Sequence, residues 1–428
     1  MAVTAAAPTL VLRFADVGIA TYASLRAIGE PAKTVTWVVE EPILLAAVQH
    51  LVDALPNPHR DETRRDAVER ALTTGPFATP AGELTVAYVL GALLISSAGW
   101  DLLMEYVATP RAVLFIAPTA RLADVPWGVL AVPTTGPTQQ ELVRARAAAT
   151  TAAGPESARL PWQLDDLSTR TEGYRLMELV DVLMAVPPNI VHSPRTPTPF
   201  AERAGRPALL ILDPRVPGQR PDSDLGSVLG RPTPQSPLVR HFGGAVEVFR
   251  RADADRHWLA TQLAQDPSRL LFVGHATAAE GDLGYADRAA IQLAEQDRLS
   301  AADLMSAGWP VPPRVALLAC ESGGDYRFDE ATGLVAALIL GGAQLVTATL
   351  WSLPTGAGYR QFGAPDDPEF DPMAELVIAV DDAHQQAAAG LAVNRWQRAQ
   401  MRRWRDGDVT ASPLYWAALV TFAVDGER

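Results

Sequence analysis

The sequence has almost no cysteine and almost no lysine, and both shortages restrict what the protein can be. Cys320 is the only cysteine among 428 residues, so an intramolecular disulfide and a zinc site built from thiolates are excluded. A reducing compartment is therefore expected. Lys33 is the only lysine and follows Ala32 rather than glycine, which excludes the Gly-Lys-Ser/Thr phosphate loop. Because the other basic residues are arginines, we expect a GC-rich, bacterial genome.

Signals for targeting, membranes, metals and nucleic acids are also missing. The N-terminal stretch MAVTAAAPTLVLRFAD lacks the basic region and long apolar core of a secretory signal. The most apolar window, LTVAYVLGALLI at 84–95, is too short to cross a bilayer and indicates a buried helix or strand. The formal charge of −13 disfavours nucleic acid, because binding there depends on neutralising phosphates. The seven histidines form no HExxH motif. We expect a cytoplasmic protein with no membrane or nucleic-acid partner, no metal and no cofactor.

What the sequence does contain is an alternation of apolar strands and helices. Such an alternation predicts a mostly parallel sheet with helices on both faces. The expected strands are two alternating ones within residues 9–40, one at the start of 112–130, and those at 207–214, 270–274, 315–319 and 343–351. Helices are expected around RDETRRDAVERAL and within 329–342. Another is expected to begin at Ser300, where Asp303 three residues on is close to a capping-box arrangement. Three long loops rich in small residues and proline are expected at 133–160, 214–237 and 353–373.

Two of the predicted strands end in residues that can do chemistry. LLFVG runs into His275, and VALLA runs into Cys320, which precedes a small polar loop. Because parallel strands end at the same edge of a sheet, the imidazole and the thiol are expected to lie there together. An imidazole can take the proton of a thiol and later protonate a leaving amine. Packing roles for the two side chains remain the alternative, and spacing indicates no third member of a triad.

The surrounding motifs resemble those of a known family. VGHATAAEGD, LSAADL, PRVALLACESGG and DEATGLVAALILGGAQLVTATLWSLP are similar to the CHAT domain, a protease module related to caspases and separases. LFIAPTARLADVPWGVL, RAQMRRWR and SPLYWAALVTFAVDG extend the likeness over roughly residues 85 to 428. The resemblance implies a caspase-like α/β fold, a mostly parallel sheet flanked by helices. We expect an N-terminal pseudo-protease-like supporting region at 1–205 and a protease region at 206–428.

The resemblance also implies a cysteine endopeptidase that acts through a Cys–His dyad. His275 would be the general acid and base, Cys320 the nucleophile, and the backbone N–H groups of Ala276 and Cys320 the oxyanion hole. The family usually has glycine where this chain has Ala276. Alanine still supplies a backbone N–H to the oxyanion hole, unless the turn requires a positive φ, which disfavours alanine. Three carboxylates flank the motifs and are candidates to line a pocket for a basic substrate side chain, although helix capping or solvation explains each equally well: Asp282, Asp325 and Asp329.

Partners follow from the same reasoning. A polypeptide substrate encoded near the gene and an activating protein are expected, in bacterial defence or signalling. The long loops could hold the enzyme inactive until a partner or a cleavage releases it. Two alternatives stay open: a catalytically silent binding scaffold with the same fold, and a different thiol enzyme such as an acyltransferase.

Overall fold

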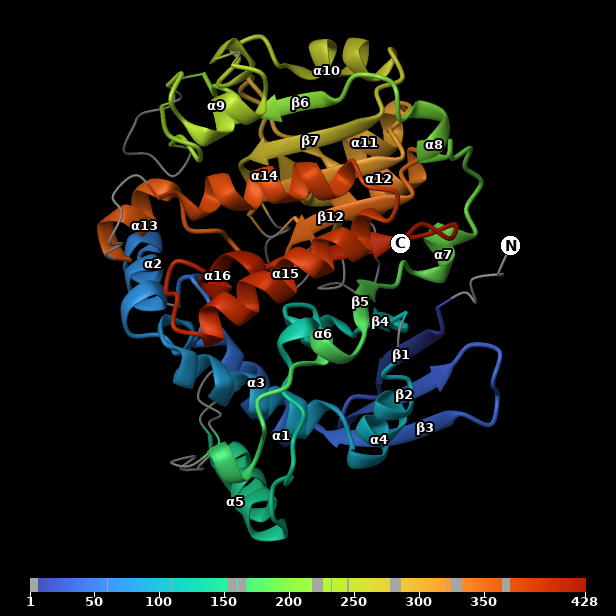
Figure 1. The fold of residues 1–428 in the computed structure, drawn as a ribbon, viewed down its shortest axis with the longest axis vertical. Helices are drawn as coiled ribbons and strands as arrows, with labels where there is room; N and C mark the ends of the chain where they lie inside the picture. Colours follow the sequence, from blue (N-terminus) through green and yellow to red (C-terminus); the bar gives the residue numbers. More distant parts are fainter. Residues whose placement is uncertain are drawn as a thin grey trace.

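The apolar segments of the sequence pair into one ten-stranded sheet with the order β3-β2-β1-β4-β5-β13-β12-β11-β7-β6. The structure is a computed structural model that describes residues 7–428 except 60, 109, 153–159, 161–166, 218–225, 232, 245, 278–285, 321, 325–332 and 364–369. Figure 1 shows the sheet running through the molecule from β6 at the top to β3 at the bottom.

One half of the sheet comes from the N-terminal part of the chain. Its strands are β3 (Thr34–Glu40), β2 (Ala20–Ala27), β1 (Thr9–Asp16), β4 (Val113–Ala117) and β5 (Asp181–Met184). Burial alternates along β1 and β2, as it does when helices cover only one face of a sheet. The helices of this half include α1 (Glu41–Val52), α3 (Pro80–Leu94) and α4 (Ser97–Glu105). The end of α3 is fixed to β3 by Trp37, whose Nε1 donates to the Leu94 carbonyl.

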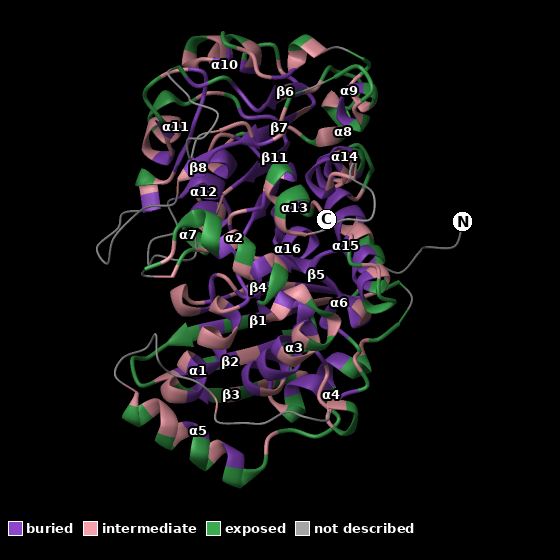
Figure 2. Ribbon diagram, turned by 90° about the vertical axis from the view of Figure 1, so that its left-hand side faces the viewer, coloured by how far each residue is buried: buried purple, intermediate pink, exposed green. Residues whose placement is uncertain are grey.

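The other half of the sheet is buried on both faces. Its strands are β13 (Leu419–Ala423), β12 (Leu345–Thr349), β11 (Arg314–Ala319), β7 (Arg269–Gly274) and β6 (Leu209–Leu212). Every residue of β11, β12 and β13 is buried. Helices α11 (Ala301–Ala307) and α12 (Leu334–Leu340) lie on one face, and α14 (Pro372–His384) and α15 (Ala389–Arg405) on the other (Figures 1 and 2). Six of the nine neighbouring strand pairs are parallel, which confirms the predicted α/β fold class.

The two halves meet where β5 pairs in parallel with β13, at Met184 and Phe422. The predicted boundary between residues 205 and 206 falls in the connection from β5 to β6, just after α8 (Phe200–Arg203). Because a single sheet includes both halves, this domain division stays a prediction.

Shorter elements surround the sheet. They are α2 (Arg64–Thr73), α5 (Gln139–Thr151), α6 (Leu176–Leu179), α7 (Pro188–Val191), α9 (Pro237–His241), α10 (Arg256–Leu263), α13 (Gly356–Phe362) and α16 (Pro413–Trp416). A separate small sheet contains β8 (Ala276–Thr277), β9 (Ala290–Ile291) and β10 (Leu299–Ser300). It lies between β7 and α11 in the chain. As predicted, Ser300 caps α11 and Asp303 completes the capping box.

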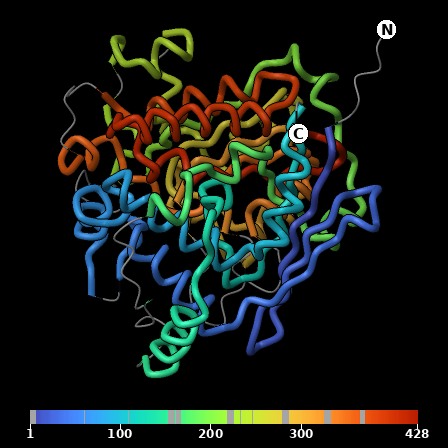
Figure 3. The backbone as a smooth tube through the Cα atoms, turned by 60° about the horizontal axis from the view of Figure 1, so that its bottom comes forward, coloured from blue at the N-terminus to red at the C-terminus, as the bar shows by residue number. Residues whose placement is uncertain are grey.

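Two of the expected loops contain helices. Within 133–160, α5 begins at a capping box formed by Thr138 and Glu141, and Figure 3 shows this helix projecting from the bottom of the molecule. Its sequence is rich in glutamine, alanine and arginine, all good helix formers. Within 353–373, α13 begins where the Thr355 side chain accepts a hydrogen bond from the Gly358 N–H. Both segments are rich in small residues and proline, and this composition favoured the expectation of loops over the helix caps that they also contain.

The apolar window at 84–95 forms most of α3, whose residues are largely buried in the core. No single helix among the described residues has the length and apolar character needed to cross a membrane. Of the helices that the structure describes, only the pair α3 and α4 passes that test when taken together, and the two are bent by 99° relative to each other.

A buried ion pair joins the two halves of the sheet and can be tested by its effect on stability. Arg398 on α15 donates to the Asp181 carboxylate at 2.6 Å, and both residues are buried. Arg398→Ala should lower the free energy of unfolding by about 3–5 kcal/mol, because it leaves a buried carboxylate without its cation. Urea denaturation measures this change.

Arg402→Ala, an exposed position on the same helix, is the matched control and should change the free energy by about 0.5 kcal/mol or less. Replacing both partners, with Arg398→Met and Asp181→Leu, should recover most of the loss. If Arg398→Ala were as stable as the control, Asp181 would not depend on this pair.

Candidate active site

The site forms where β7 and β11 end side by side. The two strands are parallel neighbours, and their register places Gly274 opposite Ala319. The next residue of each strand is His275 or Cys320, and both line a single cavity of about 330 Å³. The sequence predicted that these two side chains would share one edge of the sheet, and the structure brings them to the same cavity. Among the described residues, no hydrogen bond joins the two side chains directly.

The turn after Cys320 is fixed to the neighbouring strand β12. The Ser322 hydroxyl donates to the Leu317 carbonyl at 2.6 Å and accepts from the Thr349 N–H at 3.1 Å. The Gly323 N–H donates to the Thr349 carbonyl at 2.9 Å. A Cβ at Gly323 would lie 3.0 Å from Val420 and 3.2 Å from the Thr349 carbonyl oxygen. The serine and glycine that follow the cysteine therefore hold the turn in place, while the half-buried thiol stays at the cavity.

The thiol has a cationic neighbour from a distant part of the chain. Arg64, the first residue of α2, donates from Nη2 to Cys320 Sγ at 2.9 Å. Arg65 also lines the cavity, and its guanidinium lies over the Phe362 ring at 5.3 Å. Nothing in the sequence pattern linked α2 with the cysteine, because 256 residues separate them.

The His275 ring is buried and held by a backbone carbonyl. Its Nε2 lies 2.6 Å from the Gly226 oxygen. A carbonyl can only accept, so Nε2 carries the proton and Nδ1 of the neutral ring is left as the acceptor. Burial lowers the pKa of His275 below its ordinary value of 6.5, against the opposing effects of the Gly226 hydrogen bond and the Asp213 charge. The neutral, proton-accepting form is favoured near pH 7.

Asp213, at the end of β6, fixes the segment that supplies the Gly226 carbonyl. It is fully buried, has a positive φ of 54° and accepts hydrogen bonds from the Ser227 hydroxyl and from the N–H groups of Val228 and Leu229. Asp213 therefore acts on the His275 ring through the loop that contacts it. The sequence pattern did not single out this residue, although an aspartate directly after LLIL is a polar group at the end of the strand next to β7.

Ala276 lies in β8 and is not among the described non-glycine residues with positive φ. The structure thus removes the objection that alanine would be strained where the family usually has glycine. The Gln292 N–H donates to the His275 carbonyl, so residues 275 and 292 form the hydrogen-bonded pair of the β8–β9 ladder. The Ala276 N–H accordingly points away from β9 and is free of that ladder.

The three carboxylates proposed to line a substrate pocket lie outside the described residues: Asp282, Asp325 and Asp329. Of the loop at 214–237, residues 218–225 and 232 also lie outside them, but its described part contributes Gly226, Ser227 and Val228 to the cavity.

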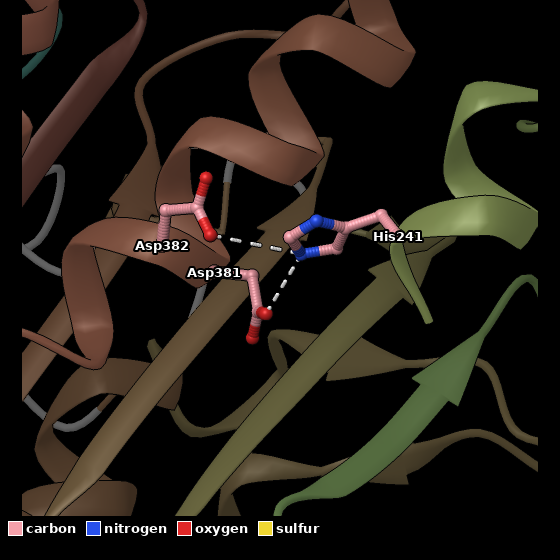
Figure 4. A group of neighbouring side chains, drawn as sticks. All are labelled: His241, Asp381 and Asp382. Atoms are coloured by element: carbon pink, nitrogen blue, oxygen red, sulfur yellow. Dashed lines mark hydrogen bonds and ion pairs between the residues drawn. The ribbon is translucent and has the colours of Figure 1, made fainter. Parts of the chain in front are cut away.

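One group of described side chains offers metal-ligating atoms close together: His241, Asp381 and Asp382. Figure 4 shows the His241 ring of α9 pointing between the two carboxylates of α14, with Nε2 at 3.0 Å from Asp381. The negative charge of Asp381 is already compensated by Arg269, whose Nε and Nη2 both donate to its Oδ1. None of these residues lines the cavity that contains Cys320. We interpret the group as an ion-pair cluster that fastens α9 and β7 to α14.

Comparison with known proteins agrees with the motifs. No curated protein matches the sequence. Among solved structures, the chain is similar to the crystal structure of the Saccharomyces cerevisiae separase–securin complex, with 11% sequence identity and a TM-score of 0.45. The match covers 97% of this chain and 30% of that one, so this chain spans about a third of its length. The CHAT domain family model matches residues 95–424. Since this match includes well over half of the sequence, the chain belongs to the CHAT domain family.

Proposed function

We propose that this protein is a cysteine endopeptidase in which Cys320 is the nucleophile and His275 the general acid and base. The observation that carries the proposal is that both side chains enter one cavity from the ends of paired strands. The Gly226 carbonyl, which binds Nε2 of His275, leaves Nδ1 to accept the thiol proton. Membership of a family related to caspase-like proteases supports the same reaction class.

The reaction follows from this arrangement. Nδ1 of His275 takes the proton from Cys320, and the sulfur attacks the carbonyl carbon of a peptide bond. The oxygen becomes negative in the tetrahedral intermediate, and the backbone N–H groups of Ala276 and Cys320 are proposed to stabilise it. His275 then gives its proton to the leaving amine. A water, deprotonated by the same imidazole, hydrolyses the thioester and regenerates the thiol.

The substrate is proposed to be a protein encoded near the gene, and an activating protein is proposed as a second partner. Arg64 donates a hydrogen bond to Cys320 Sγ in this structure. A substrate therefore has to displace the Arg64 guanidinium before the sulfur can attack. A partner protein or the substrate itself could therefore control activity by displacing Arg64 from the thiol.

The dyad is tested by removing each member. Cys320→Ala and His275→Ala should each reduce cleavage of a peptide library or of proteins encoded beside the gene by about 100-fold or more. The products are identified by mass spectrometry. His257→Ala, an exposed histidine on α10, serves as the control and should cleave as the wild type does.

Labelling of the thiol gives a second measurement. An iodoacetamide reagent should modify Cys320 faster than a denatured control and more slowly in His275→Ala. Unchanged cleavage in both variants, with equal labelling rates, would contradict the protease assignment. Binding of partners without any acylation of Cys320 would instead support the silent scaffold, and thioester exchange without peptide hydrolysis would support an acyltransferase.

The protonation of His275 predicts how activity depends on pH. Because burial lowers its pKa below 6.5, the ring still accepts a proton at pH 6.5 and loses this ability only as the pH falls further. The acid limb of kcat/KM should therefore have its midpoint below 6.5, measured with a fluorogenic peptide from about pH 4 to pH 8. A midpoint above 6.5 would show that the ring is held in its charged form instead.

Asp213 is predicted to be a positioning residue. Asp213→Asn keeps a side chain that tolerates positive φ. It replaces one accepting carboxylate oxygen by an NH₂ group, which cannot accept from the hydroxyl and N–H groups that now donate to Asp213. The loop that contains Gly226 should loosen, and kcat should fall about 10- to 100-fold. KM should change less, because Asp213 does not line the cavity. Since the Asp213 charge raises the pKa of His275, the acid limb should also move to lower pH.

The matched control for Asp213 is Asp266→Asn. Asp266 also has a positive φ, 53°, but it precedes β7 at the opposite end of the strand from His275. This variant should leave kcat and the acid limb unchanged. A fall in kcat for Asp213→Asn without a shift of the acid limb would assign Asp213 a purely structural role.

A further inference from the structure

Two arginine side chains that line the cavity come from outside the region matched by the family model. Arg64 and Arg65 open helix α2, whereas the CHAT match begins at residue 95. Figures 1 and 3 both show α2 next to α13, and the two helices are in contact. Both arginines and, from α13, Gln361 and Phe362 line the cavity. The N-terminal part of the chain therefore forms one wall of the space in front of Cys320.

The present partners of these arginines are poor ones for a guanidinium. Arg64 donates to the thiol of Cys320, and sulfur is a weak acceptor. Arg65 lies over the ring of Phe362. Among the described residues, no carboxylate pairs with either side chain. Both arginines are exposed, so each can change its partner by rotating its side chain.

The carboxylates nearest in sequence are already engaged. Asp66 accepts from the N–H and hydroxyl of Thr63 in the capping box of α2. Glu62 accepts from Arg70 at 2.7 Å, and this hydrogen bond lowers the pKa of Glu62 to about 2. Neither carboxylate lines the cavity, and its described lining contains no acidic residue at all. The described wall of the cavity thus carries positive charge without compensation.

We propose that Arg64, with Arg65 beside it, selects substrates that have a carboxylate side chain on the residue preceding the scissile bond. The inference rests on the proposed function. The scissile carbonyl has to bind at Cys320 Sγ, where Arg64 now donates, so the guanidinium moves from the sulfur to the nearest substrate group. A carboxylate matches the planar fork of a guanidinium with two hydrogen bonds and is a far stronger acceptor than a thiol.

The test uses fluorogenic peptides that are identical except for glutamate, glutamine or lysine at the residue preceding the scissile bond. The wild type should cleave the glutamate peptide with kcat/KM about tenfold or more above the glutamine peptide, as expected for hydrogen bonds to a charged group. Arg64→Ala should reduce this ratio toward one, and Arg64→Lys should retain part of it. Arg64→Glu should reverse the preference in favour of lysine.

Arg13→Glu, at an exposed position of β1 outside the cavity, changes the net charge by the same amount as Arg64→Glu and should keep the wild-type preference. A wild-type preference for lysine over glutamate would overturn the inference. So would an Arg64→Ala variant that cleaves all three peptides faster by the same factor, since Arg64 would then only obstruct the thiol.

Failure of this inference can be separated from failure of the proposed function. Cleavage that depends on Cys320 but shows no preference at this position contradicts the selection alone. Absence of any cleavage or acylation contradicts the protease function, and recognition is then measured by fluorescence anisotropy with Cys320→Ala. That variant should bind the glutamate peptide about tenfold more tightly than the glutamine peptide, and equal affinities would overturn the selection as well.

Discussion

The parallel pairing of β7 with β11 is the constraint on which the site depends. Hydrogen bonds between the strands set Gly274 opposite Ala319, so the residues that follow leave the sheet at the same level. Parallel strands need a long crossover connection, which explains why His275 and Cys320 are 45 positions apart in the sequence yet line one cavity. Each neighbouring strand then supports one member of the proposed dyad.

This support follows the order of the sheet. From β12, Thr349 binds the turn after Cys320 through Ser322 and Gly323. From β6 on the other side, Asp213 holds the loop whose carbonyl orients His275. Of these four adjacent strands, β11 and β7 thus lead into the thiol and the imidazole. The outer two, β12 and β6, lead into the residues that hold the segments next to them. Burial of these strands on both faces leaves their ends as the place where polar groups can meet.

The sequence was informative where chemistry depends on side chains in regular elements. The position of His275 and Cys320 at one edge of the sheet could be predicted because each follows a strongly apolar strand. The capping box at Ser300 could be predicted because its signal lies in the Ser300 and Asp303 side chains. The partner of His275 could not, because Gly226 acts through its backbone carbonyl and has no side-chain signature. The burial of Arg398 in the helix sequence NRWQRAQMRRWR could not be predicted either. Its buried carboxylate partner lies on β5, 217 positions away.

The N-terminal half was expected to be a catalytically silent support, and the contact of Arg64 with Cys320 argues for a closer involvement. The start of α2 is firmly held, because Arg70 donates to Glu62 and to the carbonyls of Asp53, Leu55 and Asn57. The backbone at the start of α2 is therefore held in place, while the exposed side chains of Arg64 and Arg65 can still rotate at the cavity. A helix held in this way, with an exposed guanidinium next to the thiol, suits a residue that exchanges one partner for another. Since one sheet joins the two halves, the part of the chain that precedes the CHAT match and the part that carries His275 and Cys320 form the cavity together.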